Sequence, residues 1–236
     1  MKENLAKILS VLAGLCLLTG ILLSVIDGIC FQRGFYHYEF KKENQAKVIG
    51  MPEDDLMKAT DTLLDFLQDK RDDIVVSATI DGYERDVFNT RETLHMDDVK
   101  DLYQNVLKAR SILLFIGAVL LLSVYLLCRD RQLEVIWDAF VNGSILIGMF
   151  VVLILIWILF DFSDFWMDFH YLLFDNDLFL LDPSSSIMIN MFPASFFSDM
   201  VLLIIVSYIA ILGVIYFILR FLKKKKVDCY DSCCTF

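Results

Sequence analysis

Basic side chains are absent from one long stretch of this sequence: no lysine or arginine occurs between residues 161 and 199, although the chain has 21 of them. Histidine is also scarce, with three residues among 236, whereas 57% of the residues are hydrophobic. So large an apolar fraction excludes an ordinary soluble domain and indicates a membrane protein. The formal net charge of −10 argues against nucleic acid as a partner.

Several common catalytic motifs are missing. The sequence has no G-x-x-x-x-G-K-[ST] loop, no H-E-x-x-H pair and no G-x-S-x-G turn. Nucleotide-driven chemistry, a zincin-type zinc site and a hydrolase nucleophile elbow are therefore unsupported. Any reaction should proceed without ATP, and histidine is the side chain best suited to proton transfer near neutral pH.

The six cysteines do not form a disulfide framework. Cys16 and Cys128 lie in or beside hydrophobic runs, and three more lie in the C-terminal stretch DCYDSCC, which leaves Cys30 without an obvious partner. The C-terminal stretch lacks a paired C-x-x-C knuckle, so a disordered tail is a better interpretation than a metal site.

Four apolar runs approach the roughly 20 residues that a transmembrane helix needs. We predict transmembrane segments at 1–26, 110–128, 143–160 and 200–221, joined by 27–109, 129–142 and 161–199 and followed by a basic, cysteine-containing tail at 222–236. The first run has no convincing small-residue cleavage site after it, which favours a retained span over a removed signal peptide.

The short basic clusters predict the orientation of the chain. Arg129 and Arg131 follow the second run, and Arg220 with the lysines at 223–226 follows the fourth. The positive-inside rule then assigns both termini and the 129–142 loop to the cytoplasm, and the segments 27–109 and 161–199 to the outer side. Within the cytoplasmic loop, CRDRQLEVIWDAF predicts a short amphipathic helix on the inner surface.

The segment 27–109 has the patterns of a small α+β unit. Residues 52–67 carry a helical apolar stripe that begins after Pro52, and IVVSATIDGYERDVF predicts a hairpin that turns at Asp81-Gly82. Asp97 is a plausible N-cap for a helix that continues into the second span, which would place His95 just before that helix.

In the segment 161–199, two apolar runs flank Asp175-Asn176-Asp177 and suggest a second hairpin, and Ser198 is a plausible N-cap for the fourth span. The predicted fold is a membrane α-helical protein with four transmembrane helices and a small extracytoplasmic α+β cap built from the two outside segments.

The histidines are the first candidates for chemistry. His37 lies in the aromatic stretch GFYHYEF and is better interpreted as an amphipathic residue at the membrane interface. His95 and His170 each have carboxylates nearby in sequence, which can fix the tautomer of an imidazole and stabilise its charged form. A structural role remains an equal alternative for either histidine on these grounds alone.

Two blocks resemble a known family. ETLHMDDVK in the first outside segment, and FHYLLFDNDLFLLDP with MFPASFF in the second, are similar to signatures of the lipoprotein intramolecular transacylases of Gram-positive bacteria. Phe179 stands where a tryptophan would be expected, and Ala194 where an acidic residue would be.

The resemblance implies a cell-membrane acyltransferase whose substrate is a diacylated lipoprotein. The sn-2 acyl chain would move to the α-amine of the N-terminal cysteine and leave a lyso-lipoprotein, with no cofactor and no metal. His95 and His170 would be catalytic, and the carboxylates of Asp98, Asp175 and Asp177 would orient them. Candidates for contact with the substrate and membrane lipids are Met96, Phe169 and Phe174. Which histidine acts as base stays open.

Two alternatives remain. Cys30 lies near the outer end of the first span and could carry an acyl thioester in a two-step transfer. The chain could also be a membrane scaffold without enzymatic activity, whose histidines are structural.

Overall fold

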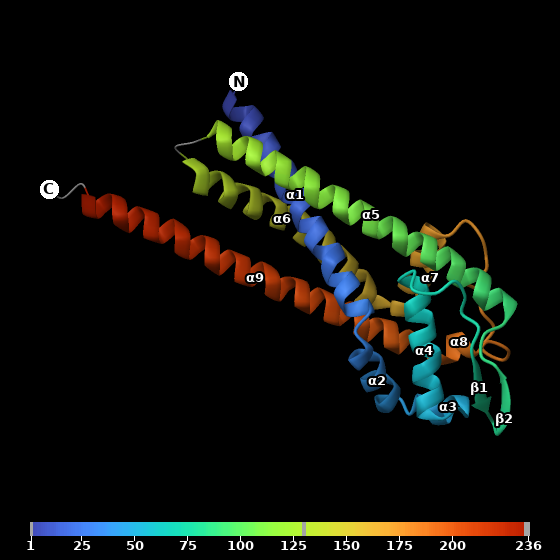
Figure 1. The fold of residues 1–236 in the computed structure, drawn as a ribbon. Coiled ribbons are helices and arrows are strands. Elements are labelled where there is room, and N and C mark those ends of the chain that lie inside the picture. Colours follow the sequence, from blue (N-terminus) through green and yellow to red (C-terminus); the bar gives the residue numbers. More distant parts are fainter. Residues whose placement is uncertain (1, 129–130, 234–236) are drawn as a thin grey trace. The chain divides into compact units, whose positions relative to one another are not determined.

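The computed structural model describes residues 2–128 and 131–233, and it divides the chain into two compact units (Figure 1). The first unit takes residues 1–26, 108–156 and 203–236, and the second takes 27–107 and 157–202. The prediction of a small α+β unit built from two separate segments of the chain is therefore confirmed. In the described part of the chain, four helices are long and apolar enough to cross a membrane, as predicted.

The four long helices are α1 (Lys2–Cys30), α5 (Thr90–Leu127), α6 (Gln132–Phe160) and α9 (Ala194–Cys233). In the first unit, Leu18 of α1, Ile147 of α6 and Tyr208 of α9 form a buried apolar cluster. The Tyr208 hydroxyl donates to the Leu18 carbonyl at 3.1 Å. At Gly14 a Cβ atom would lie 2.0 Å from the Ala139 carbonyl oxygen, so glycine allows the backbones of α1 and α6 to approach closely.

Several helix boundaries differ from the predictions. The stretch from Gln132 is the first part of α6 and not a separate amphipathic helix. Helix α9 begins at Ala194, directly after Pro193, and not at Ser198; proline is tolerated at a helix start. The same helix continues to Cys233, so the interpretation of residues 228–233 as a disordered tail is wrong.

The second unit contains α2 (Arg33–Lys42), α3 (Gln45–Ile49), α4 (Glu53–Leu67), β1 (Ser77–Ile80), β2 (Tyr83–Asp86), α7 (Phe162–Leu173) and α8 (Ile187–Met191), together with the start of α5. Helix α4 confirms the predicted stripe, since Leu56, Ala59, Leu63 and Leu64 are buried. Strands β1 and β2 pair antiparallel, and Asp81 and Gly82 turn between them with positive φ angles of 52° and 84°. The first predicted hairpin is therefore confirmed.

The second predicted hairpin is wrong. The apolar residues before Asp175 form the helix α7, and no strand is described between residues 174 and 186. The Asn176 side-chain oxygen accepts from the Leu178 amide at 3.0 Å, so the polar triplet makes a local Asx turn without paired strands.

Helix α5 begins seven residues before the predicted N-cap, Asp97, and a capping box explains the difference. The Asn89 side chain accepts from the Glu92 amide at 3.0 Å, and the Glu92 carboxylate accepts from the Asn89 amide at 2.6 Å. This reciprocal pair satisfies amide groups that the first helical turn leaves free. His95 therefore lies inside the helix and not before it.

The Glu92 carboxylate also joins the two segments of the second unit. It is 0% exposed and accepts from the Ser186 hydroxyl at 2.6 Å and from the Met188 amide at 2.9 Å. Ser186 in turn caps α8 by accepting from the Ile189 amide at 3.3 Å. One buried carboxylate thus fixes both the start of α5 and the start of α8.

Replacing Glu92 with alanine should strongly destabilise the protein. The change leaves the buried Ser186 hydroxyl and Met188 amide without their acceptor, a loss of about 2–6 kcal/mol at about 1–3 kcal/mol per unsatisfied group. Thermal unfolding in detergent measures the effect. The matched control is Glu84→Ala on the exposed strand β2, and equal melting temperatures for the two variants would refute the role of Glu92.

Candidate active site

His95 is a nearly buried histidine one helical turn after Glu92. Its side chain is 8% exposed, and its Nδ1 atom is buried without a hydrogen-bond partner among the described residues. A buried polar atom without a partner is uncommon in folded proteins and calls for an explanation. Among the described residues, no protein group forms a hydrogen bond with this ring nitrogen.

His170 is held from within its own helix. Helix α7 is capped by Asp161, whose carboxylate accepts from the amides of Ser163 and Asp164 at 2.8 and 3.1 Å. One turn before the histidine, the Trp166 carbonyl oxygen lies 2.6 Å from its Nδ1 atom. Because a carbonyl oxygen only accepts, Nδ1 of the neutral ring must carry the hydrogen. The lone pair is then on Nε2.

The two histidines lie side by side although 74 residues separate them in the sequence. Their ring centroids are 6.2 Å apart, with 36° between the ring planes. Phe174 contacts both, with centroids 5.4 Å from His95 and 5.9 Å from His170. The structure therefore brings together the two histidines that the sequence analysis singled out.

Burial holds both imidazoles in their neutral form. His95 precedes the apolar part of α5, in a charged stretch that contains Asp97 and Lys100. Desolvation by burial, assisted by nearby His170, lowers the pKa of His95 to about 4, and Asp98 opposes this shift only in part. Burial also lowers the pKa of His170, against the opposing hydrogen bond to Trp166. Both rings are therefore available as neutral groups at pH 7.

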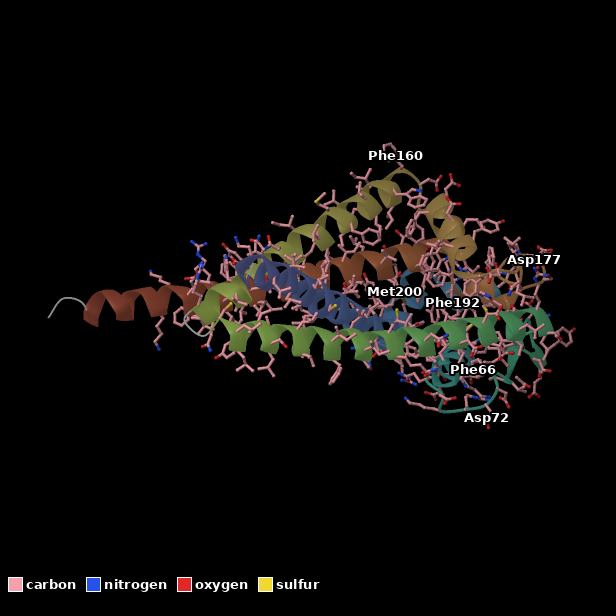
Figure 2. All side chains as sticks on the ribbon, turned by 90° about the horizontal axis from the view of Figure 1, so that it is seen from above. Phe66, Asp72, Phe160, Asp177, Phe192 and Met200 are labelled. Carbon is pink, nitrogen blue, oxygen red and sulfur yellow. The ribbon has the colours of Figure 1, made fainter. Side chains whose placement is uncertain are left out.

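Two of the three predicted orienting carboxylates have other partners. Asp98 accepts from the Asn176 side chain at 2.8 Å, and Asp177 lies 3.4 Å from the Arg91 guanidinium, which also donates to the Asp177 backbone carbonyl. Asp175 and Asp177 are exposed, and Asp177 lies at the outer edge of the 174–186 segment (Figure 2). The prediction that Asp175 or Asp177 orients His170 is therefore incorrect. The Trp166 carbonyl oxygen holds the ring instead.

An apolar cavity of about 430 Å³ adjoins both histidines. Besides His95 and His170, its wall consists almost entirely of aliphatic, methionine and aromatic side chains from α2, α4, α5, α7, α8, α9 and the 174–186 segment. These include Tyr36, Leu63, Leu64, Leu67, Met96, Val99, Leu102, Trp166, Met167, Phe169, Phe174, Phe179, Leu181, Met188, Phe192, Phe196 and Phe197. The three predicted substrate contacts, Met96, Phe169 and Phe174, all line this cavity. So do Phe179 and Ala194, the two departures from the family pattern.

Other candidate residues lie apart from the cavity wall. His37 is half-exposed, with its Nε2 atom 3.2 Å from Glu53. The Cys30 thiol contacts the Met200 sulfur at 3.6 Å, and Cys30 does not line the cavity. Among the described residues, no group of three or more His, Cys, Asp or Glu side chains could hold a metal ion; Cys234 of the C-terminal stretch lies outside them.

Sequence reasoning missed four residues that shape the site: Asn89, Glu92, Tyr36 and Trp166. The spacing Asn89-x-x-Glu92 is a capping-box signal that could have located the start of α5. Neither Tyr36 nor the Trp166 carbonyl had such a signal. His170 bonds to the backbone oxygen of residue 166, and every residue has such an oxygen.

A family model describes this architecture. The model of the lipoprotein intramolecular transacylase Lit matches residues 11–197, about four-fifths of the chain. The chain belongs to the lipoprotein intramolecular transacylase family. It is accordingly an acyltransferase, which excludes the scaffold alternative.

Solved transacylase structures share the fold. The membrane-integral lipoprotein intramolecular transacylase Lit from Bacillus cereus is 21% identical, with a TM-score of 0.79 over 95% of this chain and 98% of that chain. Two variants of the same Bacillus cereus transacylase, with a histidine replaced by arginine or by alanine, give TM-scores of 0.77 and 0.76 at 20% identity. They cover 97% and 95% of this chain and 96% of each of those chains. A search of curated protein sequences finds no significant match.

The lowered pKa of His95 predicts that acid destabilises this transacylase. The unfolded chain takes up a proton near pH 6.5, whereas folded His95 does so only near pH 4. Stability should therefore fall as pH drops from about 6.5 to 4 and should not depend on this group above that window. Melting temperatures in detergent should show a smaller acid-induced loss for His95→Gln than for the unmodified protein.

The matched control is His37→Gln, which removes a half-exposed histidine outside the cavity. This change should not reduce the acid-induced loss. An identical pH dependence in His95→Gln and the unmodified protein would contradict a buried neutral imidazole.

Proposed function

We propose that the protein moves the sn-2 acyl chain of a diacylglyceryl-modified lipoprotein to the α-amine of its N-terminal cysteine, which yields a lyso-form lipoprotein. The observation that carries this proposal is the pair of neutral histidines, 6.2 Å apart, beside an apolar cavity. Membership of the transacylase family supplies the class of reaction.

The transfer rearranges bonds within one substrate molecule. The amine nitrogen attacks the ester carbonyl carbon, a C–N bond forms, and the C–O bond to the sn-2 glycerol oxygen breaks. The amine proton ends on that oxygen as a hydroxyl. An amide replaces an ester, so the reaction is favourable without ATP, and linking donor to acceptor supplies a large effective molarity.

His170 is assigned the proton transfer. Its Nδ1–H is held by the Trp166 carbonyl at 2.6 Å, which leaves Nε2 as the basic atom. Nε2 takes the proton from the attacking nitrogen and returns it to the departing glycerol oxygen. One imidazole in a fixed tautomer can act first as base and then as acid.

His95 is assigned to the ester oxygen. A neutral imidazole offers one N–H donor, and His95 has no competing partner at its buried Nδ1. In the apolar surroundings a hydrogen bond to the developing oxyanion is stronger than it would be in water. The proximity of the two rings lets one carbonyl group contact both histidines.

The substrate amine requires little activation. An α-amine with a pKa of about 7.7–8.0 is mostly protonated at pH 7, and freeing its lone pair costs about 1 kcal/mol. The harder steps are stabilisation of the oxyanion and movement of one proton, which are the two tasks assigned to the histidines. Met96, Phe169 and Phe174 line the space where the acyl chain would lie beside them.

We place this chemistry at the outer membrane surface, with both termini in the cytoplasm. The cavity is lined only by residues from 27–107 and 157–202. The segment 161–199 has no lysine or arginine, whereas the basic clusters at 129–131 and 220–226 mark the cytoplasmic side. Substrate lipoproteins are anchored in the same membrane by their diacylglyceryl group.

Loss of either histidine should abolish the transfer. We expect His95→Gln and His170→Gln to lower the rate of lyso-lipopeptide formation by about 10²–10⁴-fold, since each removes a proton-transfer or oxyanion contact. The measurement is mass spectrometry of a synthetic diacylglyceryl lipopeptide incubated with purified protein. His37→Gln is the matched control and should keep full activity; full activity in either cavity variant would refute the mechanism.

A direct transfer predicts that Cys30 is dispensable. Cys30→Ser removes the thiol that a two-step thioester route would need, and it alters a side chain that does not line the cavity. The rate of lyso-lipopeptide formation should stay within about twofold of the unmodified protein. Loss of activity in a folded Cys30→Ser variant would favour the thioester route instead.

A further inference from the structure

The cavity wall is exposed along α7 and buried where α2, α4 and the start of α9 form it. The lining residues Ser163, Met167 and Phe169 are exposed. The lining residues Tyr36, Thr60 and Phe196 are only 7%, 0% and 2% exposed. The cavity therefore has an accessible side and a closed end.

Aromatic rings connect the histidine pair to the closed end. Successive centroid distances are 4.9 Å from His170 to Trp166, 4.4 Å from Trp166 to Phe197, 5.4 Å from Phe197 to Phe196 and 5.2 Å from Phe196 to Tyr36. All of these residues line the cavity. They form one continuous wall. Apart from His170 this wall has no titratable imidazole, carboxylate or basic group, so it suits the hydrocarbon part of an acyl chain and not a polar group.

Tyr36 is held firmly at the end of this wall. Its hydroxyl donates to the Cys30 carbonyl at 2.7 Å, and burial raises the pKa of this phenol, so it remains a donor. Its ring packs against Phe40 at 6.3 Å and against Phe192 at 6.1 Å, and Phe192 lies among the crowded side chains of this unit (Figure 2). Displacing the ring would break a buried hydrogen bond and several ring contacts at once.

We infer that Tyr36 determines substrate specificity by setting the upper length of the acyl chain that is transferred. With the ester carbonyl at the histidine pair, the chain follows the aromatic wall and its methyl end meets the Tyr36 ring. A methionine could move aside for a longer chain, but an anchored aromatic ring does not. This inference rests on the proposed function, because it assumes that the acyl chain occupies the cavity during transfer.

The test is a competition between substrates that differ only in the sn-2 chain. Full-length protein is incubated with an equimolar mixture of synthetic diacylglyceryl lipopeptides whose sn-2 chains increase by two methylenes, and mass spectrometry measures each lyso product. Product ratios give relative kcat/KM values within one sample, so they do not depend on how much of a variant is folded.

Tyr36→Leu puts a smaller side chain at the closed end of the cavity. The cavity becomes deeper, and the preference should shift toward longer chains. Each additional methylene buried in the new space should raise relative kcat/KM by about fourfold. Tyr36→Phe keeps the ring and should keep the unmodified profile. Phe40→Leu is the matched control, because Phe40 lies on the same helix and packs on Tyr36 but does not line the cavity.

A second variant acts in the opposite direction and does not require loss of the tyrosine. Thr60 lines the same buried part of the cavity from α4, so Thr60→Ile, which adds bulk on a stiff β-branched side chain, fills part of the space and should shift the preference toward shorter chains. The inference is supported if the two changes move the profile in opposite directions.

An unchanged profile in both Tyr36→Leu and Thr60→Ile, with product still formed, would overturn the inference and leave the proposed function intact. Equal shifts in Phe40→Leu and Tyr36→Leu would also overturn it, since they would indicate general loosening of the aromatic cluster. Absence of lyso product from the unmodified protein would overturn the proposed function itself.

Discussion

The buried Glu92 carboxylate is the contact on which the site depends. It begins α5 by capping the first turn with Asn89, and it fixes α8 through Ser186 and the Met188 amide. His95 is one turn further along α5, and Met188 lines the cavity. A buried carboxylate needs a donor for each oxygen, and here those donors come from both segments of the unit. The polar requirement of one side chain thereby aligns two walls of an otherwise apolar cavity.

Within that cavity, the same desolvation that disfavours charged imidazoles makes them useful. The ordinary means of orienting a catalytic histidine is a carboxylate, but a carboxylate beside His170 would raise its pKa and favour the charged ring. The Trp166 carbonyl fixes the tautomer without adding a formal charge. Burial lowers the pKa of both histidines, so the neutral forms needed to accept a proton and to donate a hydrogen bond are present together.

Apolar periodicity was sufficient to predict the four long helices, the stripe on α4 and the hairpin at Asp81-Gly82, because each depends on local patterns. The predicted start of α5 was wrong because Asp97 is also a plausible cap. The capping box of Asn89 and Glu92 satisfies two backbone amides, whereas a single cap residue satisfies one. The hairpin predicted at Asp175-Asn176-Asp177 was wrong for a related reason. The turn itself was recognised, but turns of this kind also follow helices and do not require paired strands. The partner of His170 could not be predicted at all, because every residue has a backbone carbonyl.

An intramolecular transfer demands more of cavity shape than of chemical activation. Freeing the amine of its proton costs only about 1 kcal/mol at neutral pH, and the ester is already attached to the same molecule. The main barrier is therefore to bring amine, carbonyl and glycerol oxygen into one geometry. The Cys30 carbonyl and Phe196 hold Tyr36 in place. If the methyl end of the acyl chain rests against this rigid ring, the chain length determines where its ester carbonyl lies. A chain too long for the cavity would carry its ester past the two imidazoles. Selectivity for chain length and alignment for catalysis would then be consequences of the same closed end.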